Sequence, residues 1–219
     1  MKLSRRLSAI FDMFSGEIAA DVGSDHGKLI ISLFEQGKIK KGYAIDNKKG
    51  PFTRLKQEIE NHNIIDNVIP MLSDGISELP NDVDSVIIAG MGGRLIVNIL
   101  KSHQEKLSNV QRIFVDAHNG LYEVRKNITE LGYHISKEQI LLEDGIYYEI
   151  IAFEKGAKDC LSNDECEYGP FLIKEKSPIF IQKHKERIAQ IEKIISEKEI
   201  PEKRRNNLLE EKRRLESIL

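Results

Sequence analysis

The chain has 219 residues, enough for one ordinary domain plus a modest appendage or for two small domains. Its 40% hydrophobic and 31% charged residues can build a core and also an exposed helical region. A formal net charge of −2 excludes a generally basic nucleic-acid coat, although a local basic patch can still bind phosphates. Two cysteines, Cys160 and Cys166, are too few for a disulfide framework or a structural zinc site, so we expect unrelated thiols and no metal.

The amino terminus carries basic residues, but no apolar run of secretory length follows them. No segment approaches the roughly 18 consecutive apolar residues of a membrane helix. We therefore expect a soluble cytoplasmic protein without membrane contact.

Short apolar runs alternate with amphipathic segments through the first 155 residues. Apolar residues at helical spacing predict a first helix over residues 3–14. Five apolar runs are typical of buried parallel strands, at residues 17–22, 41–45, 68–72, 83–89 and 111–116. Further amphipathic helices are predicted at residues 29–36, from 50 onward, at 95–100 and at 121–131. Two β-rich segments, 133–142 and 147–153, flank an Asp-Gly dipeptide that is typical of a hairpin turn.

The order of these elements predicts the fold class. Strands and helices in alternation form an open α/β sheet with right-handed crossovers, here ending in an antiparallel hairpin. Ligands of such sheets bind beyond the carboxyl ends of the strands. We therefore expect residues 1–155 to form one α/β domain with a site at that edge.

The composition changes after residue 153. Residues 154–169 are polar, which is typical of a linker or an irregular loop, and we place the linker at 156–177. From Pro178 the pattern predicts two long amphipathic helices, with a reversal at Pro201. Residues 178–219 should therefore form an antiparallel, coiled-coil-like helical hairpin.

The first strand ends in a turn that suits a ligand. It is Asp21-x-Gly23-Ser24-x-x-Gly27, whose glycines let the backbone approach a bound group. The turn does not match the Gly-x-Gly-x-x-Gly pattern that binds a pyrophosphate. Its acidic residues would repel a phosphate but suit a cationic amine.

Three further strand ends point to an adenosine group. Asp46, followed by Asn47, can accept hydrogen bonds from both ribose hydroxyls. Asp74-Gly75 can reach the exocyclic amine of adenine, or it is a plain turn. Gly90-Met91-Gly92-Gly93 leaves a cavity open, or it allows a strand and a helix to pack closely. Because the carboxyl ends of parallel strands share one sheet edge, we expect all these residues to meet there.

Two longer motifs, correctly spaced, resemble the bacterial TrmK family of tRNA adenine-22 N1-methyltransferases. They are Ile18-Ala19-Ala20-Asp21-Val22-Gly23-Ser24-Asp25-His26 and Ile88-Ala89-Gly90-Met91-Gly92-Gly93. Gly50-Pro51, Asp74-Gly75 and Tyr147–Ile151 also match, and the likeness covers essentially the whole chain. The chain departs from the family's usual pattern at the end of the fifth strand, which reads Asp116-Ala117-His118-Asn119, and at Asp46, where glutamate is common.

The resemblance implies a Rossmann-like class I methyltransferase fold that uses S-adenosyl-L-methionine and methylates N1 of adenine 22 in the tRNA D-loop. The cofactor site is then expected to contain Asp21, Gly23, Ser24, Asp46, Asn47, Asp74, Gly75, Gly90, Met91 and Gly92. Adenine N1 has a lone pair, so the enzyme mainly aligns the reactants and stabilises the positive charge that develops on the base. Asp25 is our first candidate for the stabilising acid and Asp116 the second, with His26 and Asn119 bonding the adenine edge.

The tRNA contacts follow from the same hypothesis. Arg5 and Arg6 on the first helix are expected to hold a phosphate or to control access to the site. Tyr148 is a candidate for stacking on a flipped base. On the hairpin, the candidates for phosphate contacts are Lys203, Arg204 and Arg205. Interleaved glutamates leave a solvated, salt-bridged face open as an alternative, and dimerisation through the hairpin as another, so we expect a monomer or a weak homodimer.

Two other functions remain open at this stage. A class I methyltransferase could act on another RNA position or on a small molecule. A non-catalytic RNA-binding protein could also retain an adenosyl cleft. The complete set of strand-end motifs favours a catalyst, and the basic two-helix appendage favours tRNA over a small molecule.

Overall fold

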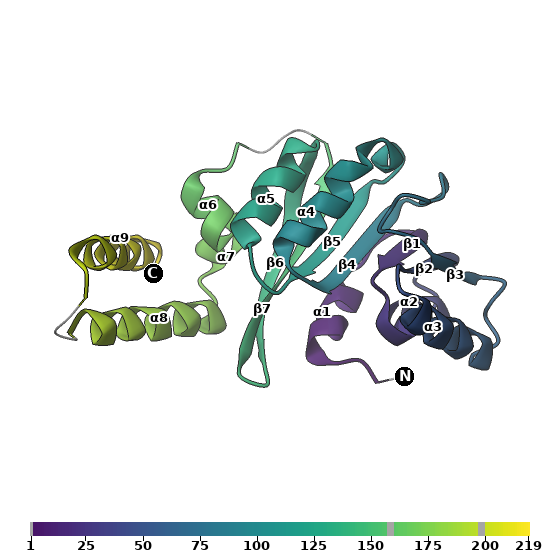
Figure 1. Cartoon of the computed structure of the whole chain (residues 1–219), viewed down its shortest axis with the longest axis horizontal. Helices are drawn as coiled ribbons and strands as arrows, with labels where there is room; N and C mark the ends of the chain where they lie inside the picture. The colour runs from purple at the N-terminus through teal and green to yellow at the C-terminus, as the bar shows by residue number, and fades with distance from the viewer. Residues whose placement is uncertain (1, 157–159, 197–199) are drawn as a thin grey trace.

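The computed structural model describes residues 2–156, 160–196 and 200–219, and its centre is a single sheet (Figure 1). The strand order is β3-β2-β1-β4-β5-β7-β6. The strands are β1 (Ile18–Val22), β2 (Lys41–Asp46), β3 (Val68–Leu72), β4 (Ser85–Met91), β5 (Arg112–Ala117), β6 (Tyr133–Glu143) and β7 (Ile146–Lys155). The first five strands pair in parallel, and β7 runs antiparallel to β5 and β6. The predicted α/β class is confirmed, and the switch point where ligands bind lies between β1 and β4.

Helices cover both faces of this sheet (Figure 1). One face packs against α4 (Gly93–Ser102) and α5 (Leu121–Glu130), and the other against α1 (Arg5–Met13), α2 (Lys28–Glu35) and α3 (Lys49–Asn61). Two 3₁₀ turns, η1 (Asp25–Gly27) and η2 (Gln104–Leu107), complete this part of the chain. The parallel strands are mostly apolar because successive side chains enter opposite cores: Val86 and Ile88 lie in one, and Ile87 in the other.

The predicted linker contains two short helices, α6 (Asn163–Tyr168) and α7 (Pro170–Glu175). The prediction of an irregular loop over residues 154–169 is therefore wrong for the last third of that segment. Ser162 and Glu165 form a capping box at the start of α6, a signal that the sequence does contain. A tertiary contact also holds the segment, because Arg125 Nη1 donates to the carbonyl oxygens of Cys166 and Glu167 at 3.1 Å each.

The carboxyl-terminal helices are α8 (Pro178–Ser196) and α9 (Glu202–Ile218). Arg187 pairs with Glu211, and further along α8 the Ile195 carbonyl accepts from Arg205. The later residue of α8 therefore contacts the earlier residue of α9. The two helices run antiparallel, as predicted. Pro201 caps α9, whereas part of the predicted turn (197–199) lies outside the described residues. The boundaries of the three predicted parts and the coiled-coil character of the hairpin stay predictions.

No helix among the described residues is long and apolar enough to cross a membrane. Both cysteines are free thiols, with Cys160 exposed and Cys166 buried. In the described part of the chain, no cluster of three or more His, Cys, Asp or Glu side chains is arranged to hold a metal ion.

Candidate methyl-donor and target-base site

The turn after β1 lies at the switch point of the sheet. The backbone N–H groups of Gly23 and Ser24 both donate to the Ile45 carbonyl, at 2.8 and 3.2 Å, which ties the turn to the end of β2. Gly23 has a φ of +76°, in the left-handed region that favours glycine. A Cβ at Gly23 would also overlap Met91 Cε, so a larger residue cannot stand here without displacing that side chain.

A cavity of about 370 Å³ opens on one side of Gly23. Asp46 lies at its edge, with Oδ1 accepting from the Lys48 N–H at 2.8 Å. Asn47 Nδ2 donates to Asp74 Oδ1 at 3.4 Å, which brings together the ends of β2 and β3. The other lining residues include the apolar side chains of Ile45, Pro51, Met91, Leu95 and Ile99. Apolar walls with carboxylates at the rim suit a purine nucleoside, with the base between the walls and the ribose at Asp46.

A second cavity of about 410 Å³ lies on the other side of Gly23, which lines both. Asp21 is buried there and accepts a hydrogen bond from Ser24 Oγ at 2.6 Å. Burial raises the pKa of the Asp21 carboxyl to about 6, against the opposing effect of the Ser24 hydroxyl. A buried carboxylate that ionises near neutral pH is suited to a cationic group of a ligand.

Arg6 enters this second cavity from α1. Its Nη1 donates to Asp116 Oδ2 at 2.5 Å, and its guanidinium carbon lies 5.4 Å from the centre of the Tyr148 ring. Asp116 is fully buried, and its Oδ1 has no hydrogen-bond partner among the described residues. Burial raises the pKa of the Asp116 carboxyl, although the Arg6 guanidinium opposes this shift. Neither the ion pair nor the unpartnered oxygen was predicted from the sequence.

The loop after β5 closes the site. The His118 N–H donates to the Met91 carbonyl at 2.9 Å, and the His118 ring lies 6.3 Å from that of Tyr148 in an edge-on arrangement. Asn119 lies beside Gly92, where a Cβ would come 3.2 Å from Asn119 Oδ1. Both alternatives for the glycine cluster are therefore realised. Gly90 and Met91 line the cavities, whereas Gly92 lines neither. Gly93 serves close packing, because a Cβ there would come 2.6 Å from the carbonyl oxygens of Asn119 and Gly120.

Neither Asp116 nor Asn119 lines a cavity, and Asp116 is connected to the second one through its hydrogen bond with Arg6. The two other predicted catalytic residues, Asp25 and His26, are not placed at the cavities. The side chain of Asp25 lies outside the described part of the structure, so its role stays a prediction. His26 has a φ of +56°, unusual for a residue with a side chain, and lines neither cavity. Its proposed bond to the adenine edge stays a prediction as well.

The predicted RNA-binding residues divide into three places. Arg6 lines the second cavity, and the Tyr148 ring lies beside its guanidinium without lining the cavity itself. Arg5 is instead engaged with the tip of the β6–β7 hairpin, where its Nη1 donates to the Leu142 carbonyl at 3.0 Å. Lys203, Arg204 and Arg205 are exposed on α9, at the opposite end of the molecule from α3 (Figure 1).

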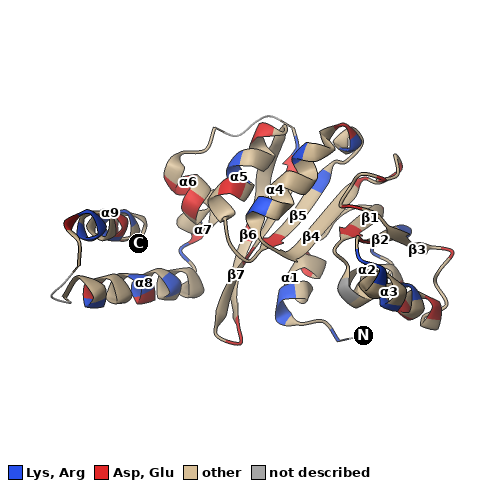
Figure 2. Cartoon of the chain, viewed as in Figure 1, with Lys and Arg blue, Asp and Glu red and all other residues tan. Residues whose placement is uncertain are grey.

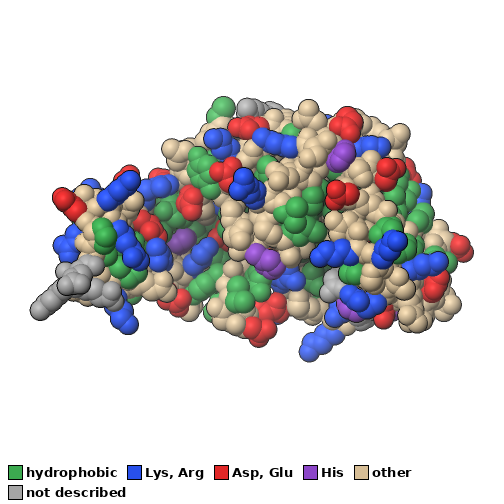
Figure 3. All heavy atoms as spheres, viewed as in Figure 1, with side chains coloured by type: hydrophobic (Ala, Val, Ile, Leu, Met, Phe, Trp, Pro, Cys, Tyr) green, Lys and Arg blue, Asp and Glu red, His purple; other side chains and the backbone are tan. Residues whose placement is uncertain are grey.

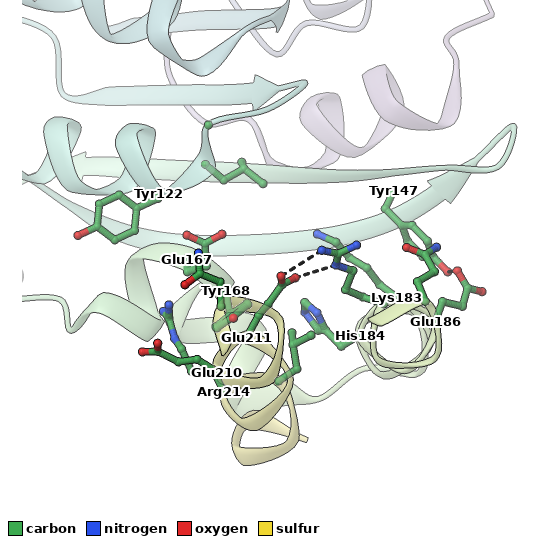
Figure 4. Close-up of a pocket in the computed structure, with 16 residues that line it drawn as sticks. Tyr122, Tyr147, Glu167, Tyr168, Lys183, His184, Glu186, Glu210, Glu211 and Arg214 are labelled. Carbon is green, nitrogen blue, oxygen red and sulfur yellow. Dashed lines mark hydrogen bonds and ion pairs between the residues drawn. The ribbon is translucent and has the colours of Figure 1, made fainter. Parts of the chain in front are cut away.

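A third and larger cleft, of about 820 Å³, separates the sheet domain from the hairpin (Figure 4). Its three basic side chains are all neutralised: Lys183 by Glu149, Arg187 by Glu211, and Arg214 by Asp164. The same cleft is lined by Glu167, Glu186 and Glu210. An excess of carboxylates repels phosphates, so the charge of this cleft does not favour an RNA backbone.

Comparisons with known proteins agree with this geometry. The sequence model of the TrmK family, described as tRNA (adenine(22)-N(1))-methyltransferase, matches residues 19–217. The tRNA (adenine(22)-N(1))-methyltransferase of Bacillus subtilis is 29% identical over 201 residues, which cover 89% of this chain and 84% of the relative. The crystal structure of the B. subtilis m1A22 tRNA methyltransferase TrmK has a TM-score of 0.89 at 28% identity, with 99% of this chain and 98% of that one covered.

A second solved relative was crystallised with a ligand. Streptococcus pneumoniae Sp1610, in complex with S-adenosyl-L-methionine, has a TM-score of 0.91 at 33% sequence identity. The match covers 100% of both chains, including the helical carboxyl-terminal part. Since the family match spans nearly the whole chain, the protein belongs to the TrmK family of tRNA (adenine(22)-N(1))-methyltransferases.

Proposed function

We propose that this protein transfers a methyl group from S-adenosyl-L-methionine to N1 of adenine 22 in bacterial tRNA. The observation that carries the proposal is the pair of cavities that meet at Gly23: one suits adenosine, and the other is lined by Arg6, which contacts Asp116 and Tyr148. The activity carried by the B. subtilis relative and the ligand bound by the S. pneumoniae relative are those that this arrangement suits. A tRNA substrate implies that the protein acts in the cytoplasm.

The residues present fit the methyl donor. The Asp46 carboxylate can accept from both ribose hydroxyls, and Asp74 from the adenine amine. The buried Asp21 carboxylate faces the second cavity, where a ligand ammonium would favour its ionised form. When bound, S-adenosyl-L-methionine supplies an electrophilic methyl group on a cationic sulfur.

Methyl transfer to adenine N1 requires little general acid–base catalysis by the protein. The lone pair of adenine N1 forms the new N–CH₃ bond while the S–CH₃ bond breaks and sulfur keeps its electron pair. The base becomes a cation whose charge is shared by N1, C6 and N6. The protein's task is to hold N1 in line with the methyl group and to stabilise the positive charge.

Asp116 and Tyr148 are the groups best placed for that task. A buried carboxylate stabilises a neighbouring cation more strongly than an exposed one, because little water screens it. The Tyr148 ring offers a flat surface on which an unstacked base can lie. Asn119 and His26 remain proposed contacts of the adenine edge, and Asp25 remains a candidate for the acid that stabilises the positive charge.

The exposed basic residues of α9 are the proposed tRNA-backbone contacts. The side chains of Lys203 and Arg204 form no hydrogen bond or ion pair with other described residues, whereas Arg205 Nη2 donates to the Ile195 carbonyl at 2.9 Å. Acidic residues are interspersed with the basic ones along α8 and α9 (Figures 2 and 3). Phosphate contacts are therefore proposed for the start of α9, and the monomeric or weakly dimeric state stays a prediction.

The decisive experiment is methyl transfer to total bacterial tRNA. The protein is incubated with tRNA and a labelled methyl donor, and the modified nucleoside and its position are mapped. We expect 1-methyladenosine at position 22 and no label in a transcript with guanine there. A different modified base, or none at all with protein that binds the donor, would contradict the proposal.

A further inference from the structure

The Arg6 guanidinium lies in a slot formed by four residues. Asp116 accepts its hydrogen bond, and the Tyr148 ring lies 5.4 Å from its central carbon. On a third side, a Cβ added to Gly90 would come 3.3 Å from Arg6 Nη1 and 3.9 Å from His118 Nε2. The absence of a side chain at Gly90 therefore leaves room for the guanidinium beside His118.

The group in this slot and the product of the reaction have the same chemistry. A guanidinium is a planar, delocalised cation whose N–H groups donate to carboxylates and whose face attracts aromatic rings. An adenine methylated at N1 is also a planar cation, with its charge spread over N1, C6 and N6 and with N–H donors on N6. Asp116 and Tyr148 can bind either group by the same two interactions, but the slot cannot hold both at once.

Asp116 provides a second observation. Arg6 satisfies Oδ2, but Oδ1 is buried without a hydrogen-bond partner among the described residues. Buried acceptors without partners are rare because each one raises the free energy of the structure. The Gly90 N–H and His118 also lower the pKa of Asp116, but a ligand whose donors reach both oxygens would satisfy this carboxylate better than the side-chain hydrogen bond from Arg6 does.

We propose that Arg6 occupies the place of the target adenine in the free protein and that its side chain must leave Asp116 before the base enters. Only the side chain needs to move, because the Glu143 carboxylate accepts from the backbone N–H groups of Arg5 and Arg6 and fixes the start of α1. This role rests on the proposed function, since it takes adenine as the group that enters. Of the two roles expected for Arg6, this one is control of access to the site and not phosphate binding.

The test is tRNA binding by the full-length protein with S-adenosylhomocysteine present, so that no turnover occurs. Arg6→Met removes the competing cation at similar length. We expect the variant to bind a tRNA with adenine at position 22 at least fivefold more tightly than the wild type. The gain should disappear with the same tRNA carrying uridine at that position, because no adenine then enters the slot.

Two further variants make the result decisive. Arg5→Met loses the same charge from the same helix turn, but its guanidinium bonds the Leu142 carbonyl outside the slot, so no gain is expected. Arg6→Gln keeps a planar hydrogen-bond donor for Asp116. If Arg6→Met does not fold, Arg6→Gln should bind the adenine tRNA more tightly than the wild type. Weaker or unchanged binding of the adenine tRNA by the Arg6 variants overturns the role of Arg6. Methyl transfer by the wild-type protein is scored separately, so loss of that activity would instead contradict the proposed function.

Discussion

Glu149 of β7 and Lys183 of α8 form an ion pair, with Lys183 Nζ donating to Glu149 Oε1 at 2.5 Å. The other oxygen of this buried carboxylate accepts from Arg125 Nη2 at 2.5 Å, and Arg125 also bonds Glu138. Tyr148, the preceding residue of β7, points to the opposite face and approaches Arg6. Consecutive residues of one strand therefore carry the anchor of the helical hairpin and the surface proposed for the target base.

Glu149→Gln is expected to destabilise the protein by about 3–5 kcal/mol, the usual effect of removing one partner from a buried ion pair. Arg125 would keep only Glu138 for its fully buried charge. Lys183→Met should have a smaller effect, because Lys183 is partly exposed and Glu149 keeps Arg125. The measurement is urea unfolding. Glu175→Gln, at an exposed glutamate of α7 that forms no ion pair with another described residue, is the control and should leave the midpoint unchanged.

Asp46→Asn is expected to weaken S-adenosyl-L-methionine binding by about 10–100-fold, because hydrogen bonds to a charged acceptor contribute roughly 1.5–3 kcal/mol. The amide keeps the shape but offers one acceptor in place of two. Calorimetric titration measures the change, with the exposed Asp66→Asn as the matched control. Equal affinity of the wild type and the Asp46 variant would remove Asp46 from the cofactor site.

Lys203→Glu combined with Arg204→Glu is expected to raise the KM for tRNA at least tenfold and to leave kcat unchanged. Phosphate contacts position the RNA but take no part in the chemistry. The dependence of binding on salt should also become shallower, because fewer counterions are released. Lys106→Glu combined with Lys137→Glu makes the same change of charge on the sheet domain. If both pairs weaken tRNA binding equally, general repulsion explains the effect and the start of α9 is not a docking site.

The sequence predicts the sheet well and the side-chain network poorly. Continuous apolar runs locate the ends of β1 to β5 to within two residues. They do so because parallel strands that are buried on both faces consist mainly of apolar residues. Most of the predicted cofactor residues line one of two adjoining cavities, since the carboxyl ends of parallel strands share an edge. Arg6 and Asp116 are separated by 110 positions, and no periodicity marks such a pair. Likewise, α6 depends on Arg125, a residue that the local sequence of the helix does not reveal.

Cofactor binding is expected to depend on pH through Asp21. Burial raises its pKa from the ordinary value of 3.8 to about 6. Between these values the folded protein holds a proton that the unfolded chain has lost, so the contribution of Asp21 to stability falls as the pH rises from about 4 to 6. The ligand's ammonium favours the ionised carboxylate, so at pH 5 binding must first expel that proton. We therefore expect S-adenosyl-L-methionine to bind about tenfold more weakly at pH 5 than at pH 7.5.

Calorimetric titration of the wild type and Asp21→Asn across this range tests the assignment. The variant has no proton to lose, so its affinity should be lower than that of the wild type at pH 7.5 and nearly constant with pH. Asp46→Asn should bind more weakly at every pH but keep the slope, because Asp21 is intact in that variant. A wild-type affinity that is flat from pH 5 to 7.5 would show that the ligand's cationic group does not lie beside Asp21.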